Sequence, residues 1–354
     1  MKTLYVIGNG FDIHHNLDTR YQSFARYLAA KNSELYDLLL NYYGLPDIKS
    51  PDLTDDEYAL WSRFELALAD LDYQSVLDDY SDYAANLGSE DFSDSDWDSY
   101  QIEIKQVVDK LTVKLISLFN DFILKIDYQS IPDSSLLALE KKSHFLNFNY
   151  TQTLQQAYQV AENRITYIHN RADSVNCTLI LGHGTDPENF EEKNELPPEG
   201  LNAQELDQWY EHMADQYEWS YEQAKQQVLS YYTAAFKNTS SIIESRRDFF
   251  ENLTDVKKVI VLGHSLSEVD IKYFQALTQR LNQNVIWIVS YYGEAERQAH
   301  KEILIGLGIA DSKFVQIKIN DLKRRHWLSG RLHYFYRIQM RFFFKWIKIK
   351  CFSF

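Results

Sequence analysis

The chain has 354 residues, of which 45% are hydrophobic and 15% aromatic, so it can bury a sizeable core and is neither wholly disordered nor collagen-like. Its formal charge of −15 is unevenly distributed, because residues 323–354 hold nine Lys and Arg and no Asp or Glu. The preceding 322 residues therefore carry 27 basic and 51 acidic side chains, a net charge of −24. A body this acidic is a poor general ligand for nucleic acid, whose phosphates require cationic partners.

The cysteine and hydropathy patterns bear on the compartment. Two cysteines, Cys177 and Cys351, are too few for a disulfide framework, which fits a reducing environment. The sequence shows no signal-peptide pattern and no run of 18 apolar residues. We therefore expect a cytoplasmic protein.

Short runs rich in β-branched and aromatic residues predict strands, in chain order, at Leu4–Ile7, Phe145–Phe148, Thr166–Ile168, Val259–Leu262 and Val285–Val289, with a further candidate at Thr178–Leu181. The runs at 259–262 and 285–289 are apolar throughout, which is typical of parallel strands covered on both faces. Helical spacing of apolar residues follows the first and fourth runs. Strand, polar loop and helix in repetition predict an α/β fold, a doubly wound and mainly parallel sheet.

Two long helical patterns interrupt this core, at about 31–139 and 187–254. The first is strongly acidic, since residues 51–100 hold fifteen acids and a single base, Arg63. No flexible linker separates either segment from the core. We therefore interpret residues 1–322 as one α/β nucleotide-binding domain with two helical insertions, followed by a basic, aromatic C-terminal tail at 323–354.

The loop after the first predicted strand is rich in glycine, with Gly8, Asn9, Gly10 and Asp12 in five residues. Glycines after a first strand let the backbone approach a phosphate, while amide groups and a helix N-terminus supply partial positive charge. The alternative is a tight strand-to-helix turn without a ligand.

A second polar group follows the next two strands. Asn149 comes directly after one strand and His169 after the other. The amide of an asparagine can hold a water or a ribose hydroxyl in a fixed geometry, and a nearby histidine can exchange a proton near neutral pH. Alternatively, Asn149 begins a turn and His169 is a hydrogen-bonded core residue.

The third polar loop, at 263–270, begins where the fourth strand ends. Gly263 and Ser265 can approach a nucleotide, and Asp270 lies in a first helical turn, where the helix dipole alone also favours a carboxylate. Because ligands bind outside the carboxyl ends of parallel strands, all three loops are expected at one sheet edge. The three loops together predict a nucleotide site.

The motifs resemble those of the AbiH abortive-infection proteins of bacterial phage defence over about residues 1–322. The resemblance rests on five segments: Gly8–Asp12 with Leu17–Phe24, Trp61–Glu65, Phe148–Thr151, Ile168–His169, and Gly263–Leu266 with Asp270. Membership implies a role in abortive infection and a possible phage-derived trigger. A homo-oligomer is also compatible with such a role.

AbiH proteins in turn distantly resemble sirtuin-type, Rossmann-like NAD-binding domains, which implies NAD as substrate or ligand. By this resemblance the cofactor contacts would be Gly8, Asn9, Gly10, Asp12, Gly263, His264, Ser265 and Asp270. Asn149 would position an attacking water, and His169 would hold or deprotonate the ribose. The implied activity is that of an NAD+ glycohydrolase, in which cleavage of the nicotinamide–ribose bond passes through an oxocarbenium-like state.

The chain departs from the sirtuin pattern at three points. Thr151 stands where an aspartate is usual, and Asn170 follows His169 where a glycine is common, although His183-Gly184 follows nearby. No cysteine pair is present for the sirtuin zinc module. Plain NAD hydrolysis therefore fits better than peptide deacylation.

Two other functions use the same residues. One is a metal-dependent phosphoester hydrolase, whose metal site would draw on His14, His15, His169, His183 and His264 with Asp12 and Asp270. None of the usual metal-ligand spacings occurs, however, and no metal ligand is assigned. The other alternative is a non-catalytic nucleotide sensor of phage infection, which Thr151 favours because the usual aspartate is missing.

The tail has the pattern of a basic amphipathic helix. Arg337, Arg341, Lys345 and Lys348 recur at helical spacing, and aromatic and aliphatic residues fall on the opposite face. Such a helix can lie weakly on an anionic membrane or dock on the acidic body of its own chain. Charge complementarity slightly favours docking.

Overall fold

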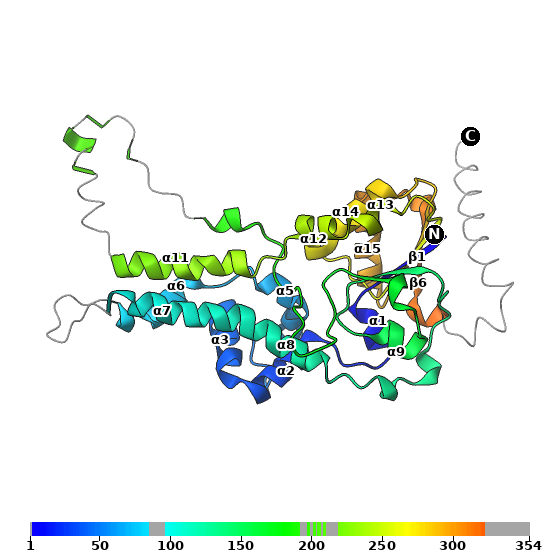
Figure 1. The fold of residues 1–354 in the computed structure, drawn as a ribbon, viewed down its shortest axis with the longest axis horizontal. Coiled ribbons are helices and arrows are strands. Elements are labelled where there is room, and N and C mark those ends of the chain that lie inside the picture. The colour runs from blue at the N-terminus through cyan, green and yellow to red at the C-terminus, as the bar shows by residue number, and fades with distance from the viewer. Residues whose placement is uncertain are drawn as a thin grey trace. The chain divides into compact units, whose positions relative to one another are not determined.

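A computed structural model describes residues 2–84, 96–191, 197–198, 201–202, 204–206, 208–209 and 219–322 (Figure 1). The predicted amphipathic helix at 323–354 lies outside the described residues. The chain divides into two compact units, of which the first comprises residues 1–24, 119–180 and the described chain from 238 onward. The second comprises 25–118 and 181–237. The boundaries expected for the helical insertions, 31–139 and 187–254, stay a prediction.

The first unit is built on a six-stranded, wholly parallel sheet. Its strands are β1 (Thr3–Ile7), β2 (His144–Asn147), β3 (Ile165–Tyr167), β4 (Lys258–Leu262), β5 (Ile286–Tyr291) and β6 (Phe314–Lys318). They lie in the order β3-β2-β1-β4-β5-β6, so the chain builds outward from β1 in one direction and then in the other. This confirms the predicted doubly wound α/β fold and puts the topological switch point between β1 and β4.

The strand predictions were wrong at two places. Thr178–Leu181 is not a strand, because its backbone bonds to loops: Ile180 donates its N–H to the carbonyl of His169 and accepts from the Tyr150 hydroxyl. The edge strand β6 was missed. Its polar Gln316 and Lys318 interrupt the apolar run that marks the central strands.

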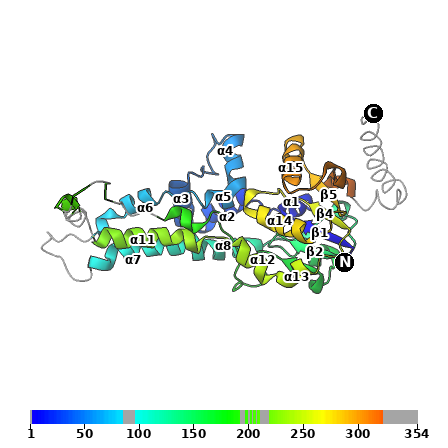
Figure 2. The same cartoon turned by 90° about the horizontal axis from the view of Figure 1, so that it is seen from above.

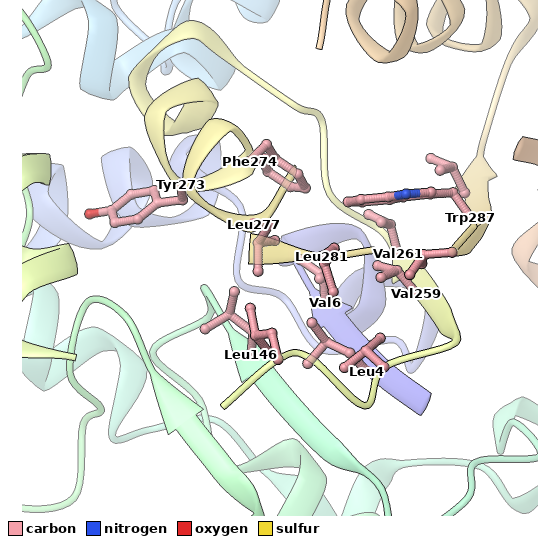
Figure 3. Close-up of a cluster of buried hydrophobic side chains, with 14 of the residues drawn as sticks. Leu4, Val6, Leu146, Val259, Val261, Tyr273, Phe274, Leu277, Leu281 and Trp287 are labelled. Carbon is pink, nitrogen blue, oxygen red and sulfur yellow. The ribbon is translucent and has the colours of Figure 1, made fainter. Parts of the chain in front are cut away.

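Helices cover both faces of the sheet. On one face, alternate strand residues such as Leu4 and Val261 pack against Phe274 and Leu277 of α14 (Ile271–Arg280), as Figure 3 shows. On the other face, Tyr5 and its neighbours pack against α1 (Asn9–His14) and α9 (Thr153–Tyr158). Burial on both faces explains the uninterrupted apolar sequence of β4.

Among the described residues, the first unit also contains α12 (Thr239–Ser245), α13 (Arg247–Glu251) and α15 (Glu294–Gly306). Two helices cross a boundary between the units, α2 (Tyr21–Lys31) and α8 (Leu115–Ile123). Helix α14 is preceded by a 3-10 turn, Glu268–Asp270, which supplies the last residue of the third polar loop. No helix of the described residues is long and apolar enough to cross a membrane.

The second unit is helical. It contains α3 (Ser33–Tyr43), α4 (Asp55–Leu60), α5 (Phe64–Ala67), α6 (Tyr73–Asp79), α7 (Asp96–Asp109) and α11 (Trp219–Ala234), with a π-helical turn, Lys110–Lys114, continuing α7. Helices α7 and α11 run side by side (Figures 1 and 2). Tyr231 and Tyr232 of α11 donate their hydroxyls to the carbonyls of Leu68 and Leu71, which anchors α11 to the chain after α5.

An ion pair with a fully buried lysine lies at the segment Trp61–Glu65 of this unit. Within Trp61–Glu65, the indole is fully buried and the Glu65 carboxylate accepts a hydrogen bond of 2.5 Å from Lys237 Nζ. The Lys237 side chain is wholly buried. Such a cation needs its partner, because an unpaired buried charge costs far more than an exposed one.

We expect Lys237→Met to lower the free energy of unfolding by about 1–3 kcal/mol, because it removes the buried ammonium group that the half-buried Glu65 carboxylate binds. Lys237→Met/Glu65→Met should be clearly less destabilised than the single variant, since it leaves no charge behind. Urea unfolding followed by circular dichroism measures both. A single variant as stable as the unaltered protein would contradict the prediction.

Candidate functional site

The loops after β1 and β4 interlock at the switch point. Gly8 donates its N–H to the Leu262 carbonyl at 3.0 Å, and Gly10 donates to the Gly263 carbonyl at 2.7 Å. A Cβ on Gly8 would lie 2.5 Å from His264 Cα, and one on Gly263 would lie 2.1 Å from Phe11 N. Each loop therefore occupies the space that a side chain on the other would need.

The close approach of the two loops is enough by itself to require glycine at these positions. Gly263 also has φ +64°, a left-handed conformation that favours glycine. The tight strand-to-helix turn proposed for the first loop is present, because α1 begins at Asn9, directly after Gly8. Contact of Gly8, Gly10 and Gly263 with a phosphate stays a prediction.

Asn9 has an anchoring contact of its own. Its Oδ1 accepts a hydrogen bond of 2.5 Å from the Thr19 hydroxyl, and its Nδ2 donates to the Thr19 carbonyl at 3.1 Å. The paired bonds hold the chain between α1 and α2. Ser265 is exposed, as is Asn9, whereas most other predicted site residues are buried.

Asp12 forms a buried polar cluster with the loop after β2. Its two carboxylate oxygens each accept a hydrogen bond of 2.6 Å, one from the Thr151 hydroxyl and one from the Thr153 hydroxyl. Burial raises the pKa of Asp12 to about 6, and the hydrogen bonds from these threonines and Asn149 partly oppose the rise. The cluster ties the β1 loop to the β2 loop.

The cluster gives Thr151 a structural role. Its hydroxyl donates directly to the Asp12 carboxylate. The carboxylate in the cluster thus comes from a different strand end than Thr151. Asn149 lies in the same region, since its Nδ2 donates to the Gly8 carbonyl at 3.1 Å.

His169 lies at the end of β3 on a rigidly held backbone. Asn170 adopts φ +64°, a left-handed conformation that favours glycine and that asparagine tolerates better than most residues. Arg246 of the chain between α12 and α13 donates to the Tyr167 carbonyl at 3.1 Å and to the Asn170 side-chain oxygen at 2.9 Å. These bonds fix the turn that carries His169.

His169 and His264 meet at Asp270. The Asp270 carboxylate lies 3.7 Å from Nε2 of His169 and 3.5 Å from Nε2 of His264. Both imidazoles are only 3% exposed. The ring of Phe148 stands edge-on to both histidines, with centroid separations of 5.6 Å and 4.4 Å. The loops after β2, β3 and β4 therefore converge at the carboxyl edge of the sheet.

The structure also adds residues that the sequence did not indicate. Thr153 and Arg246 are two of them, and His300 of α15 is the third. His300 is fully buried, with Nε2 3.6 Å from Glu296 one helical turn earlier. Burial lowers the pKa of His300, while Glu296 and the backbones of Ser265 and Ser290 oppose this. In the sequence, the spacing of four residues between Glu296 and His300 was the signal that could have indicated this pair.

The other histidines are used elsewhere. His14 Nε2 donates to the Ser135 carbonyl, and His15 donates from Nδ1 to the Phe11 carbonyl while its Nε2 accepts from the Tyr158 hydroxyl. Burial lowers the pKa of His15 to about 4. His183, in the second unit, is surrounded by the rings of Phe190, Tyr231, Tyr232 and Phe236. Within the described ranges, no group of three or more His, Cys, Asp or Glu is arranged to hold a metal ion.

Fold and site together define a doubly wound α/β protein with a buried polar site at its topological switch point. The family model of the bacteriophage abortive infection protein AbiH matches residues 4–291. The chain therefore belongs to the AbiH family, as its motifs predicted. No curated protein matches the sequence. The sirtuin-type interpretation stays a prediction.

We expect Gly263→Ala to destabilise the protein by roughly 1–3 kcal/mol more than Gly308→Ala, because a clash with Phe11 adds to the strain of a left-handed alanine. Gly308 is a matched control, with φ +81° and no atom within 4 Å of its Cβ position. Denaturant unfolding of both variants measures the difference. Equal losses would show that the interlock contributes little.

Asp12 should give the protein a defined pH dependence. Because its pKa is about 6 in the folded protein and 3.8 for an ordinary, solvated aspartate, the folded form holds more protons between these values. Stability due to Asp12 is therefore present below about pH 4 and is lost as the pH rises through 6, by up to about 3 kcal/mol. Asp12→Asn should remove this slope from unfolding free energies measured between pH 4 and 7. Parallel pH profiles for the two proteins would contradict the assignment.

Proposed function

We propose that this AbiH protein acts in defence against bacteriophage by binding NAD and hydrolysing its nicotinamide–ribose bond. The observation that carries the proposal is the convergence of loops from β1, β2, β3 and β4 at the carboxyl edge of the sheet, where parallel α/β proteins bind nucleotides. Loss of NAD would stop the metabolism of an infected cell and with it phage multiplication.

The proposed chemistry uses one water and two side chains. The oxygen of water bonds to C1′ of the nicotinamide ribose as the C1′–N bond breaks, and the electron pair of that bond leaves with nicotinamide. The Asn149 amide oxygen would orient the water while its Nδ2 is held by the Gly8 carbonyl. His169 would accept the proton that the water loses, leaving ADP-ribose as the second product.

Burial of the site supports an activity that is silent before infection. Asn149 is 6% exposed and His169 is 3% exposed, so a dinucleotide reaches them only after the surrounding loops rearrange. A phage-derived trigger would supply the binding energy for that rearrangement. The family assignment is consistent with such conditional action.

The same burial favours one alternative, a nucleotide sensor without catalysis. In that case the loops report an occupied site to a partner, and Asn149 and His169 serve only as contacts. Thr151 at the usual aspartate position fits this alternative as well. Nucleotide binding without bond cleavage would distinguish it from the enzyme.

Incubation with NAD, with and without extract of phage-infected cells, should release free nicotinamide, measured by chromatography. We expect Asn149→Ala to reduce the release rate at least 100-fold, because the water loses its orienting group. The variant should also lose protection of cells against phage. Asn252→Ala is the matched control, since this exposed amide donates to the Asp248 carbonyl at the end of α13 and belongs to none of the three polar loops.

Failure of the unaltered protein to release nicotinamide under both conditions would rule out the enzyme. Tight NAD binding in that case, measured by calorimetry, would support the sensor. Full protection by Asn149→Ala would contradict both roles for this residue.

A further inference from the structure

Asp270 joins two buried histidines that come from different strand ends. Its Oδ1 lies 3.7 Å from Nε2 of His169, which follows β3, and its Oδ2 lies 3.5 Å from Nε2 of His264, which follows β4. All three residues are buried. The carboxylate therefore has one histidine on each oxygen.

The proton position on His264 follows from its other nitrogen. The N–H of Leu266 donates to His264 Nδ1 at 2.9 Å, so Nδ1 is an acceptor and the proton of the neutral ring is on Nε2. That proton faces Asp270 Oδ2. Leu266 adopts φ +55°, an uncommon conformation for a bulky residue, in order to present this N–H.

Asp270 does not serve the helix that follows it. It occupies the N-cap position of α14, but its backbone is already helical and its side chain makes no capping hydrogen bond. An aspartate selected for the helix end would accept from the first free N–H groups of that helix. The carboxylate faces the histidines instead.

The surroundings of His169 make this contact effective. Phe148 and Tyr150 from the β2 loop and Tyr273 from α14 surround the imidazole with aromatic rings. Its charged neighbour in this set is Asp270, with His264 behind it. In a site with little water, one carboxylate at this distance strongly favours the protonated form of an imidazole.

We propose that Asp270 is the positioning residue for His169, with His264 holding the carboxylate from the opposite side. Asp270 Oδ1 faces His169 Nε2 from 3.7 Å, too far for a hydrogen bond, and favours a proton on that nitrogen through its charge. When His169 takes up a second proton, the Asp270 carboxylate stabilises the imidazolium. The catalytic part of this inference rests on the proposed NAD hydrolysis, whereas the geometry and its effect on His169 do not.

The test is the titration of His169 in protein labelled with 15N-histidine, with the signal assigned by its loss in His169→Gln. Asp270→Asn should lower the pKa of His169 by at least one unit, a tenfold or greater fall in its proton affinity. Glu268→Gln is the matched control, because it removes an exposed carboxylate two residues away and should leave the titration unchanged. Asp270→Glu should restore most of the shift.

A second measurement needs no variant of Asp270. The 15N shifts of the unaltered protein report which ring nitrogen carries the proton, and we expect Nε2 for both His264 and His169. A His264 ring protonated on Nδ1 would overturn the arrangement even if Asp270→Asn failed to fold. A His169 pKa that is the same in folded Asp270→Asn and in the unaltered protein would overturn it as well.

These outcomes are separate from those of the proposed function. Nicotinamide release together with an unchanged His169 pKa in Asp270→Asn would keep the enzyme and reject the role of Asp270. A lowered pKa without nicotinamide release would keep the role of Asp270 and reject NAD hydrolysis. If both hold, the acid limb of the rate profile should move to lower pH in Asp270→Asn by the same amount as the pKa.

Discussion

The contact between the β1 and β4 loops is the constraint on which the rest of the first unit depends. Gly10 bonds to the Gly263 carbonyl, and each glycine leaves room for the backbone of the opposite loop. In a doubly wound sheet the connections that follow these two neighbouring parallel strands run toward opposite edges of the sheet. Their loops therefore ordinarily diverge and leave a crevice. Here backbone contact joins the two loops, and polar side chains from the neighbouring strand ends lie close to it.

Two polar clusters lie beside the contact between the β1 and β4 loops. The Asp12 carboxyl, held by two threonine hydroxyls, links the loop of β1 to that of β2. The Asp270 carboxylate links the turn after β3 to the loop of β4 through two histidines. Each cluster buries a carboxyl group, and the hydrogen-bond donors or ionisable rings around it offset part of the cost of removing that group from water.

The sequence predicted the features that depend on local pattern. Apolar runs such as Val259–Leu262 identified the central strands, and glycine and polar residues after them identified the loops of the site. The apolar run Thr178–Leu181 was misread because its backbone partners, the carbonyl of His169 and the hydroxyl of Tyr150, are distant in sequence. Strand β6 was missed because its polar Gln316 and Lys318 leave no long apolar run, as an edge strand permits.

The same distinction applies to the site. Asn149, His169 and Asp270 could be predicted as site residues because each directly follows a recognisable strand or begins a helix, and their role at a site stays a prediction. Thr153 and His300 could not be, because their importance comes from partners brought close by folding, the Asp12 carboxyl and the loop ends of β4 and β5. The interpretation of the glycines also changed, since close packing between two loops now stands beside the predicted phosphate contact. Packing between segments that are distant in sequence cannot be inferred from the sequence alone.

The strand order also governs when the protein can assemble during synthesis. The central strand β1 pairs with β4, whose residues are made about 250 positions later, so the sheet cannot close until most of the chain has left the ribosome. The second unit ends at residue 237 and has all its residues available before β4 is made. The helical unit can thus fold first, and the site at the switch point is necessarily a late product of translation.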